Sequence, residues 1–347
     1  MRKALSILLT LAVLGLAPAL RAEVTKTARL THDATRPFAV ENLAGTMKVM
    51  PGSGSTAEVV ATLHAESQGL LDAMSFELTT DEKGRPSLRV RYPATERRFR
   101  YPQGNSNTET KYDGRRVKVT RDQGALAYAD LEVHLPRDVA EAWLRNGVGA
   151  LTASGVSGHL KLDTASGDIT VSDVAGDVLA DTGSGNVKAT GARGRFRCDT
   201  GSGDCAVSGF RGEDLNLDTG SGNLDVSDVE TRRLRADTGS GDVRVSRTLA
   251  EDVAADTGSG SLNMELTGAS LSRVKADTGS GDVRLHLPRD ASFEVRADMG
   301  SGDLESGFAD AQAILDRREV VGYRRGDGRI KIDVDTGSGD VAVGPTP

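Results

Sequence analysis

The chain has 347 residues, a formal net charge of −7 and a calculated isoelectric point near 5.4. Such an acidic chain argues against general nucleic-acid binding, because phosphate backbones attract basic surfaces. Aromatic residues make up 4% of the chain against 41 glycines. That composition suits thin, uniform coils and argues against a deep aromatic-lined ligand cleft.

Residues 1–22 have the pattern of a signal peptide. Arg2 and Lys3 form the charged start, residues 5–16 form the apolar run, and residues 17–22 offer small residues for cleavage. The run is too short for a transmembrane helix, and no later stretch is apolar enough to span a bilayer. We therefore expect an exported, soluble chain in the periplasm, outside the cell or at the cell surface.

Residues 23–140 carry strand signals without a fixed period, and we predict an N-terminal β region or cap here. Candidate strands lie at 38–50, 57–65, 74–79, 88–92, 117–120 and 131–135. These strands form either irregular early coils or a small β cap over the end of the stack, whose open edge needs a cover.

Residues 141–347 are organised by a repeated phrase, Asp-Thr-Gly-Ser-Gly-Asp followed by an apolar residue. The steps between successive copies are 18 to 21 residues, except for a final step of 37. Apolar residues stand one and three positions before the first aspartate and six after it, so each repeat is predicted to be strand, Gly-rich turn, strand. Near or full copies begin at Asp163, Asp181, Asp199, Asp218, Asp237, Asp256, Asp277, Asp298 and Asp335.

The constant period favours parallel stacking over a meander of hairpins. We predict an all-β fold, a parallel β-solenoid resembling a β-helix, with about ten short coils. The turn glycines permit positive φ angles, and the Asp, Thr and Ser side chains can bond the backbone of the turn. The column four residues before the aspartate alternates in sign, which favours coils stacked in register. Its members are Asp177, Arg195, Asp214, Arg233, Asp252, Arg273 and Glu294.

Two polar stretches interrupt the strand pattern, at 93–116 and 307–328, and we interpret both as projecting loops. The simpler interpretation is that they are solvated connections. The alternative is that they contact an anionic envelope polymer or a protein partner through basic and aromatic side chains. The candidate contact residues are Arg97, Arg98, Phe99, Arg100, Tyr101, Tyr323, Arg324 and Arg325.

The stacked aspartates raise the question of calcium binding. Carboxylates about 5 Å apart repel by roughly 1 kcal/mol in water, so turn N–H groups or cations should offset the repulsion. Calcium is known in Gly- and Asp-rich solenoid turns, but the phrase lacks the Gly-Gly-x-Gly-x-Asp pattern of those sites. We favour turn capping, keep calcium as the alternative, and expect no other cofactor. The calcium candidates are Asp199, Asp204, Asp237, Asp242, Asp277 and Asp282.

No residue pattern in the sequence indicates catalysis. Asp-Thr-Gly-Ser resembles the aspartic-protease phrase, but that chemistry needs two copies sharing one proton, whereas periodic turns account for every copy here. The five histidines are scattered, and no His-Glu-x-x-His zinc motif occurs.

Cys198 and Cys205 are the only cysteines, and they flank one turn at inward positions. An oxidising compartment would favour a disulfide between them, whereas the alternative is two small buried residues. In either case, we expect their Cα atoms to lie less than about 7 Å apart.

The chain resembles the bacterial "putative adhesin" family, a domain of unknown function built from short β-solenoid repeats. The resemblance rests on the Thr-Gly-Ser-Gly-Asp turns, on Val-x-Gly corners at 156–158 and 174–176, and on Leu-Pro-Arg-Asp at 135–138 and 287–290. It covers about residues 38–343, implies surface or envelope adhesion, and offers no catalytic residues to transfer.

The favoured function is therefore that of a non-enzymatic, exported β-solenoid. It would bind or scaffold an unknown polymer or protein of the cell envelope, in the manner of an adhesin. The first alternative is a passive structural or stress-related envelope protein without a specific ligand. The second is a polysaccharide-acting enzyme with a cleft at the cap.

Overall fold

The computed structural model describes residues 23–104, 107–137 and 139–347. These residues are nearly all β, with 31 strands and one short helix, α1 (Gln68–Asp72). The predicted all-β class is confirmed, while the predicted signal peptide at 1–22 lies outside the described residues. The chain divides into two compact units between Gly185 and Asn186. The boundary expected between 140 and 141 falls inside a strand of the first unit.

The described part of the first unit contains α1 and fifteen strands. The strands are β1 (Val24–Asp33), β2 (Phe38–Ala44), β3 (Met47–Pro51), β4 (Thr56–Ala65), β5 (Ser75–Thr80), β6 (Pro86–Arg91), β7 (Arg98–Arg100), β8 (Thr108–Tyr112), β9 (Arg115–Thr120), β10 (Ala125–Leu135), β11 (Val139–Val148), β12 (Leu151–Ser154), β13 (Ser157–Ser166), β14 (Ile169–Ser172) and β15 (Ala175–Thr182).

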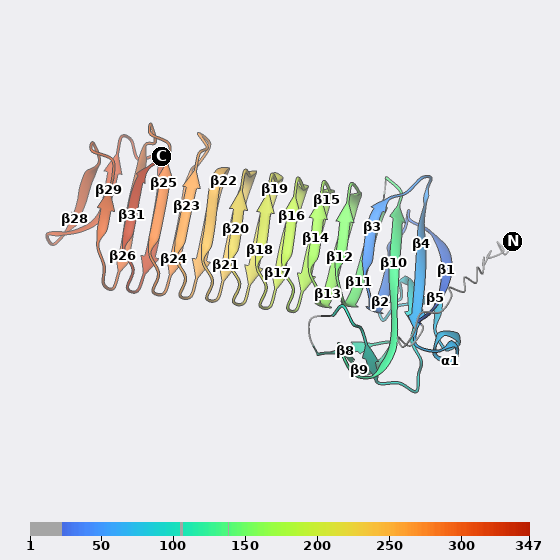
Figure 1. The fold of residues 1–347 in the computed structure, drawn as a ribbon. Helices are drawn as coiled ribbons and strands as arrows, with labels where there is room; N and C mark the ends of the chain where they lie inside the picture. Colours follow the sequence, from blue (N-terminus) through green and yellow to red (C-terminus); the bar gives the residue numbers. More distant parts are fainter. Residues whose placement is uncertain (1–22, 105–106, 138) are drawn as a thin grey trace. The chain divides into compact units, whose positions relative to one another are not determined.

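Parallel coils make up one side of this unit. On one face β2, β11, β13 and β15 pair in parallel, and on the other β3, β12 and β14 do the same. Before these coils the pairing becomes antiparallel, with β1 on β4, β4 on β10, and β5 on β6 (Figure 1). These antiparallel strands lie within residues 23–140.

The stretch at 93–116 is not a plain loop, which corrects the interpretation from sequence. It contains β7, β8 and the start of β9. β8 and β9 form an antiparallel hairpin whose two-residue turn is Asp113 and Gly114. Their φ angles of 48° and 72° are both positive, as in the two-residue turns whose twist matches that of the flanking strands. β7 pairs in parallel with β9 and with β10.

The second unit contains sixteen strands. They are β16 (Val187–Thr190), β17 (Arg193–Thr200), β18 (Cys205–Ser208), β19 (Arg211–Thr219), β20 (Leu224–Ser227), β21 (Glu230–Thr238), β22 (Val243–Thr257), β23 (Leu262–Leu266), β24 (Arg273–Thr278), β25 (Val283–Leu287), β26 (Phe293–Met299), β27 (Leu304–Ser306), β28 (Gln312–Asp316), β29 (Glu319–Arg325), β30 (Ile330–Thr336) and β31 (Val341–Pro345).

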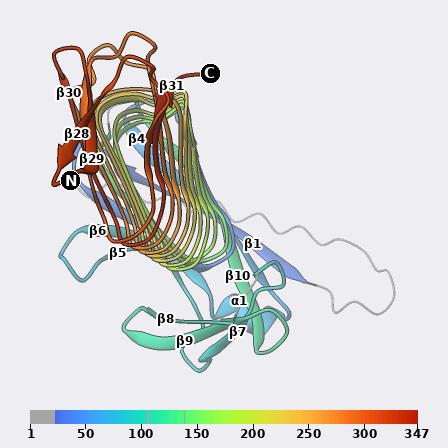
Figure 2. The ribbon, with the colours of Figure 1, turned by 90° about the vertical axis from the view of Figure 1, so that its left-hand side faces the viewer.

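Successive repeats of the second unit stack in parallel, as the period predicts. One face runs β16, β18, β20, β22, β23, β25, and the other runs β17, β19, β21, β22, β24. β22 serves both faces because it continues through the corner, where Arg247 has a φ of 45°. Figure 2 shows the coils of this unit superimposed in a view along the stack.

The stacking order departs from the chain order at the end of the second unit. β30 pairs in parallel with β24 on one side and β26 on the other, and β31 lies likewise between β25 and β27. The coil formed by β30 and β31 is thus inserted between two coils that precede it in sequence (Figure 1).

This insertion alters the charge column predicted from sequence. Arg195, Asp214, Arg233, Asp252 and Arg273 are direct neighbours in that order. The next neighbour of Arg273 is Lys331, not the predicted Glu294. The alternation therefore fails at one step, because the last coil interposes a second cation.

The stretch at 307–328 also contains regular structure, which corrects its interpretation as a loop. β28 and β29 form an antiparallel hairpin, and β29 extends the sheet by pairing with β26. The two residues of its turn are Arg317 and Arg318, with φ angles of 46° and 87°.

The threonine of each turn bonds both its own coil and a neighbouring coil. The hydroxyl of Thr238 accepts a hydrogen bond from the N–H of Gly241 (3.1 Å) and donates one to the carbonyl of Gly222 (2.8 Å). These threonines are buried, so the hydroxyls satisfy backbone groups that water cannot reach. The same two bonds recur at Thr219, Thr257, Thr278 and Thr336.

The second glycine of each turn is required by close stacking. A Cβ atom on Gly241 would lie 1.9 Å from the carbonyl oxygen of Gly222, and Gly260 and Gly281 meet the same obstacle. Of the glycines in the repeated Gly-Ser-Gly phrases within 186–347, all of which the structure describes, Gly302 alone has a positive φ, of 123°. The positive φ that glycine permits is therefore used at only one of these positions.

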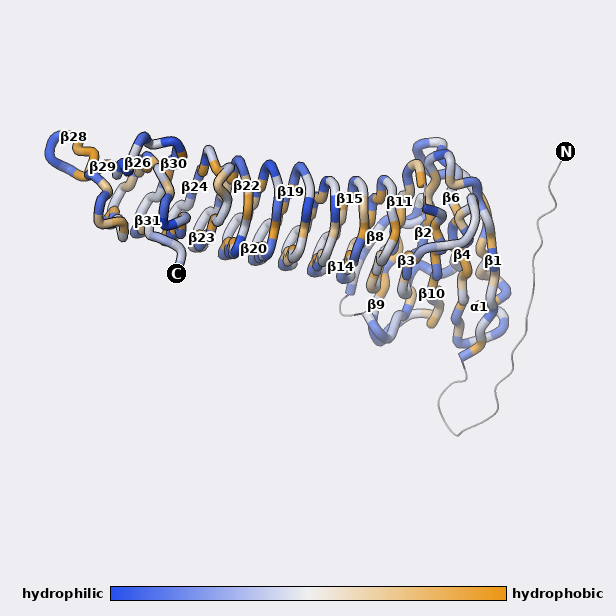
Figure 3. Tube along the Cα trace, turned by 90° about the horizontal axis from the view of Figure 1, so that it is seen from above, coloured by the Kyte–Doolittle hydropathy of each residue, from blue (hydrophilic) through white to orange (hydrophobic). Residues whose placement is uncertain are grey.

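The core runs through the coils as columns of small and branched side chains. Leu215, Leu234 and Val253 are neighbours in one such column and are at most 1% exposed. Hydrophilic residues return at the corners of successive coils (Figure 3). Cys198 and Cys205 face each other within this core as a disulfide, with Cα atoms 6.7 Å apart.

Candidate functional site

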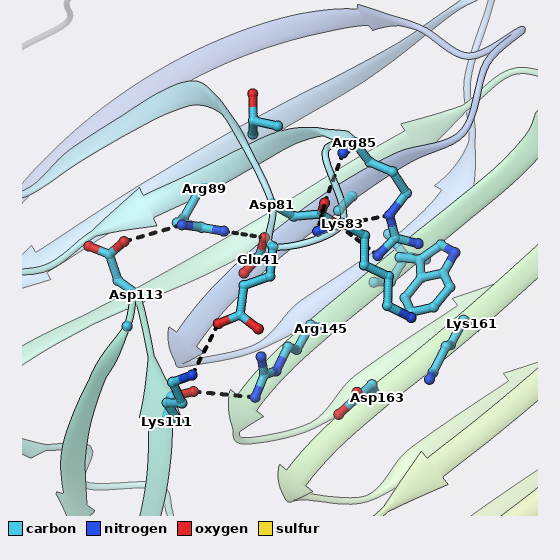
Figure 4. Close-up of a pocket in the computed structure, with 16 residues that line it drawn as sticks. Glu41, Asp81, Lys83, Arg85, Arg89, Lys111, Asp113, Arg145, Lys161 and Asp163 are labelled. Atoms are coloured by element: carbon cyan, nitrogen blue, oxygen red, sulfur yellow. Dashed lines mark hydrogen bonds and ion pairs between the residues drawn. The ribbon is translucent and has the colours of Figure 1, made fainter.

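A cavity of about 430 Å³ lies in the first unit beside Trp143, the only tryptophan in the chain. Its walls come from β2, β6, β11 and β13 and from the turns after β5 and β8 (Figure 4). Most of the lining side chains are charged, and Trp143 is the one aromatic ring among them. The charged residues are Glu41, Asp81, Glu82, Lys83, Arg85, Arg89, Lys111, Asp113, Arg145, Lys161 and Asp163.

Trp143 reaches the cavity because of strand alternation in β11. Ala142 and Leu144 point into the core and are fully buried, so Trp143 between them points outward. Its neighbour on β13 is Lys161. A ring at an outward position of a coil is available to solvent and to a ligand.

Three cations surround the ring. The guanidinium carbon of Arg85 lies 3.4 Å from the ring centroid, and the ammonium groups of Lys83 and Lys161 each lie 4.6 Å from it. Such contacts are favourable because the ring face is electron-rich. They also concentrate positive charge around one apolar surface.

Asp81 holds Arg85 in place. Its carboxylate accepts hydrogen bonds from the N–H groups of Lys83 (2.9 Å) and Arg85 (2.8 Å), and it pairs with the Arg85 guanidinium at 2.6 Å. Burial raises the pKa of Asp81, but these bonds outweigh burial and hold the pKa below its ordinary value. Arg85 is thus an anchored, neutralised cation.

A second network forms the opposite wall. Arg89 is 8% exposed and pairs with Glu41 (2.7 Å) and Asp113 (3.2 Å), while Ser87 donates to Glu41 (2.6 Å). Burial opposes the charge on Arg89, but the bond to Glu41 and both carboxylates raise its pKa. Behind them the buried Tyr112 hydroxyl donates to the carbonyls of Glu41 and Val90. These paired groups give the cavity a rigid wall.

The remaining charges of the cavity are not balanced. Lys111 pairs with Glu82 at 3.3 Å, and Arg145 donates to the Lys111 carbonyl at 3.3 Å. Within the described residues, Lys83 and Lys161 contact no carboxylate, and Asp163 contacts no cation. Three cations without a carboxylate partner thus face one free carboxylate, which leaves the site with a local positive excess.

The calcium candidates lie in the second unit, in two columns. Asp204, Asp242 and Asp282 accept backbone N–H groups from the next coil at 2.8, 3.0 and 3.1 Å, which is the capping role favoured from sequence. In the part of the chain that the structure describes, no three His, Cys, Asp or Glu side chains converge to hold a metal ion.

The other column stacks carboxylates without such bonds. Asp199, Asp237 and Asp277 belong to it, with Asp218 and Asp256 interleaved in register. Burial, together with the charges of adjacent aspartates, raises the pKa values of Asp218 and Asp256. Arg197 pairs with Asp199 at 3.2 Å, so the repulsion is only partly offset.

The candidate contact residues at 97–101 divide into surface and core. Phe99 and Tyr101 are 0% and 2% exposed, so these rings pack inside the first unit and cannot contact a partner, which corrects their assignment. Arg100 pairs with Glu66 at 3.1 Å. Arg97 and Arg98 remain exposed.

The candidates at 323–325 are partly structural. Arg325 donates to the Ala291 carbonyl (2.7 Å), pairs with Asp310 (2.7 Å) and lies over the Phe308 ring. The Tyr323 hydroxyl donates weakly to the Leu304 carbonyl at 3.4 Å. Arg324 is exposed.

Sequence reasoning missed the Trp143 cavity. The low aromatic content argues against an aromatic-lined cleft, yet one ring suffices here because cations and carboxylates complete the wall. One signal was available: Trp143 stands two residues before the first position of the atypical first repeat, where alternation points outward, and Lys161 follows one repeat later.

Comparison with known proteins yields a family match and distant structural similarities. The family model described as Toastrack DUF4097 matches residues 104–344. No curated protein matches the chain.

The solved structures to which the chain is similar include two from Parabacteroides distasonis. A "putative lipid binding protein" is 11% identical, with 91% of this chain and 96% of that chain covered and a TM-score of 0.44. A "putative adhesin" is 10% identical, with 92% and 96% covered and a TM-score of 0.34. A "putative cell adhesion protein" from Clostridium sporogenes is 9% identical, with 92% and 100% covered and a TM-score of 0.23.

Proposed function

The chain belongs to the Toastrack DUF4097 family, a domain of unknown function, and we propose that it is a non-enzymatic, exported binding or scaffold protein of the bacterial cell envelope, in the manner of an adhesin. The observation that carries this proposal is the cavity beside Trp143. Its volume of about 430 Å³ falls in the range of small-molecule sites, about 300–1,000 Å³. An outward ring with anchored charges around it is the kind of surface that binds a ligand group.

The rigidity of the walls supports binding. Arg85 is fixed by Asp81, and Arg89 is fixed by Glu41 and Asp113, so these groups lose little conformational freedom when a ligand enters. Within the described residues the sole helix, α1, has five residues, far fewer than a bilayer-spanning helix needs.

Sedimentation with envelope fragments tests the proposal. Chain starting at Glu23 is mixed with fragments from the producing bacterium and compared with Trp143→Ala, using Leu249→Ala as an exposed apolar control in the second unit. We expect wild type and Leu249→Ala to co-sediment and Trp143→Ala to bind about tenfold more weakly, because buried aromatic anchors dominate binding.

The other outcomes contradict particular parts of the proposal. Equal binding by Trp143→Ala would exclude the cavity as the site. No co-sedimentation would favour the passive structural alternative, and release of soluble sugars from the fragments would favour an enzyme. Export is tested separately by sequencing the N-terminus of the protein made in its own cells, where a start at Glu23 or close to it is expected.

A further inference from the structure

We propose that the Trp143 cavity binds an acidic saccharide, a sugar ring that carries a carboxylate, and this inference rests on the proposed function above. Three features point to this chemistry: a positive excess around the ring, a free carboxylate on the strand beside it, and an apolar ring surface.

The positive excess selects an anion. Lys83 and Lys161 both place their ammonium groups 4.6 Å from the same ring centroid, and within the described residues neither contacts a carboxylate. Neither ammonium group has a carboxylate partner, so a ligand carboxylate at the ring would supply one. Arg145 on β11 is a third donor on the same wall, held by the Lys111 carbonyl at 3.3 Å.

The free carboxylate selects hydroxyl groups. Asp163 lines the cavity next to Arg145 on the adjacent strand, and the described residues give it no hydrogen bond or ion pair. A carboxylate only accepts hydrogen bonds, so it favours ligands with O–H donors. A phosphate group carries nearly two negative charges and would be repelled by Asp163. A singly charged sugar with free hydroxyls can pair its carboxylate with the lysines and donate its hydroxyls to Asp163.

The apolar wall and the volume set the shape of the ligand. The guanidinium carbon of Arg85 lies 3.4 Å from the centroid of the Trp143 ring and holds the ring in place. The ring therefore offers a rigid apolar surface beside polar groups. A cavity of about 430 Å³ admits a short saccharide. Together these features match a uronic-acid residue, with its carboxylate toward Lys83 and Lys161 and its hydroxyls toward Asp163.

Trp143 supplies a direct readout because it is the only tryptophan in the protein. Trigalacturonate is titrated into the chain starting at Glu23, in EDTA, while tryptophan fluorescence is followed. The fully methyl-esterified trimer is the matched neutral probe, and inorganic phosphate is the simple anion. We expect saturable quenching by trigalacturonate, with the ester and phosphate at least about tenfold weaker.

Charge-removal variants locate the site. Lys83→Gln with Lys161→Gln should weaken trigalacturonate binding by at least about tenfold, while Arg235→Gln with Lys275→Gln, an equal charge change on exposed residues of the second unit, should leave it within about twofold. Equal unfolding midpoints show that the variants fold.

The opposing results are distinct. Equal quenching by trigalacturonate and phosphate would show a plain anion site. Equal quenching by trigalacturonate and its methyl ester would show that the carboxylate has no role. Equal loss of binding in both double variants would show non-specific charge attraction. Each outcome overturns the proposal. If trigalacturonate fails while envelope fragments still bind through Trp143, the ligand class alone is wrong; if both fail, the proposed function fails with it.

Discussion

Thr238 shows how a single side chain joins two coils of the stack. Its hydroxyl accepts from Gly241 and donates to Gly222, and both backbone groups lie where water is excluded. The repeat therefore keeps threonine for a bond between coils as well as for the local turn. Capping by turn side chains was predictable from sequence, whereas the bond to the neighbouring coil needed the register.

Replacing Thr238 by Val should destabilise the protein. Valine has nearly the same shape but leaves the Gly222 carbonyl and the Gly241 N–H unsatisfied, at a cost of about 1–3 kcal/mol in the free energy of unfolding. Thr238→Ser retains the hydroxyl and should cost clearly less. Urea unfolding of both variants measures this, and equal losses would assign the effect to packing instead of the two bonds.

Folding places the carboxylate of Asp218 beside those of Asp199 and Asp237, and the like charges repel. Burial and the charges of Asp199 and Asp237 raise its pKa, so the folded state holds its proton more tightly than the unfolded state, whose value is near 3.8. The penalty is present above the folded pKa and is relieved as the pH falls through that value toward 3.8.

Asp218→Asn should accordingly raise the unfolding midpoint at pH 7, and the gain should vanish below about pH 4. Asp290→Asn removes an exposed carboxylate outside the column and serves as the control. Thermal unfolding across this pH range measures both. A gain that persists at low pH would show that the charge of Asp218 is not responsible.

At the level of strands, the charge column on one face of the second unit ties each coil to the next. Arg233 lies between Asp214 and Asp252 in register and pairs with Asp214 at 3.0 Å. Both side chains of that pair are substantially exposed, at 47% and 35%. Each pair should contribute only about 0–1 kcal/mol, so the column acts more on register than on stability.

Arg233→Glu creates two like-charge contacts and should lower the unfolding midpoint more than Arg233→Gln does. The difference between the two variants should shrink in 1 M salt, where charges are screened within about 3 Å. Equal midpoints at low salt would mean that the alternation sets no register.

Two hairpins show where sequence reasoning could and could not succeed. Asp113-Gly114 closes β8–β9, and Asp-Gly between strands is a strong hairpin signal that the polar composition of 93–116 obscured. Arg317-Arg318 closes β28–β29 with the same positive φ angles but without glycine or asparagine. No local residue preference predicts that turn, because its conformation is imposed by pairing with β26.

For the whole chain, the period near 20 residues was enough to predict parallel coils, their inward columns and the facing cysteines. The period could not predict where the coil of β30 and β31 stacks. The repeat at Asp335 has the same apolar and turn positions as the other repeats, so it fits equally well between two earlier coils or after the last of them. The cavity could not be predicted either. The turn that holds Lys83 and Arg85 lies about 60 residues before Trp143, and how the N-terminal strands pair decides whether this turn comes close to the ring.

Removing residues 329–347 tests the role of the inserted coil. Without it, β24 and β26 lose their shared parallel neighbour, and so do β25 and β27. Amides in these four strands should exchange with deuterium at least about tenfold faster, while those of β17 and β19 change little. Removing residues 346–347 alone is the control. Unchanged exchange in β26 would show that this strand is held by β29 alone.

The inserted coil also bears on how the protein is made. Synthesis proceeds from the N-terminus, so β26 and β27 leave the ribosome before β30 and β31, the strands with which they pair. Until residues 330–345 emerge, β24 and β25 on one side and β26 and β27 on the other each present an open strand edge, a form that is prone to aggregation. A chain truncated before residue 329 therefore leaves these edges unpaired, and the coil of β30 and β31 covers the edges of both neighbouring coils at once.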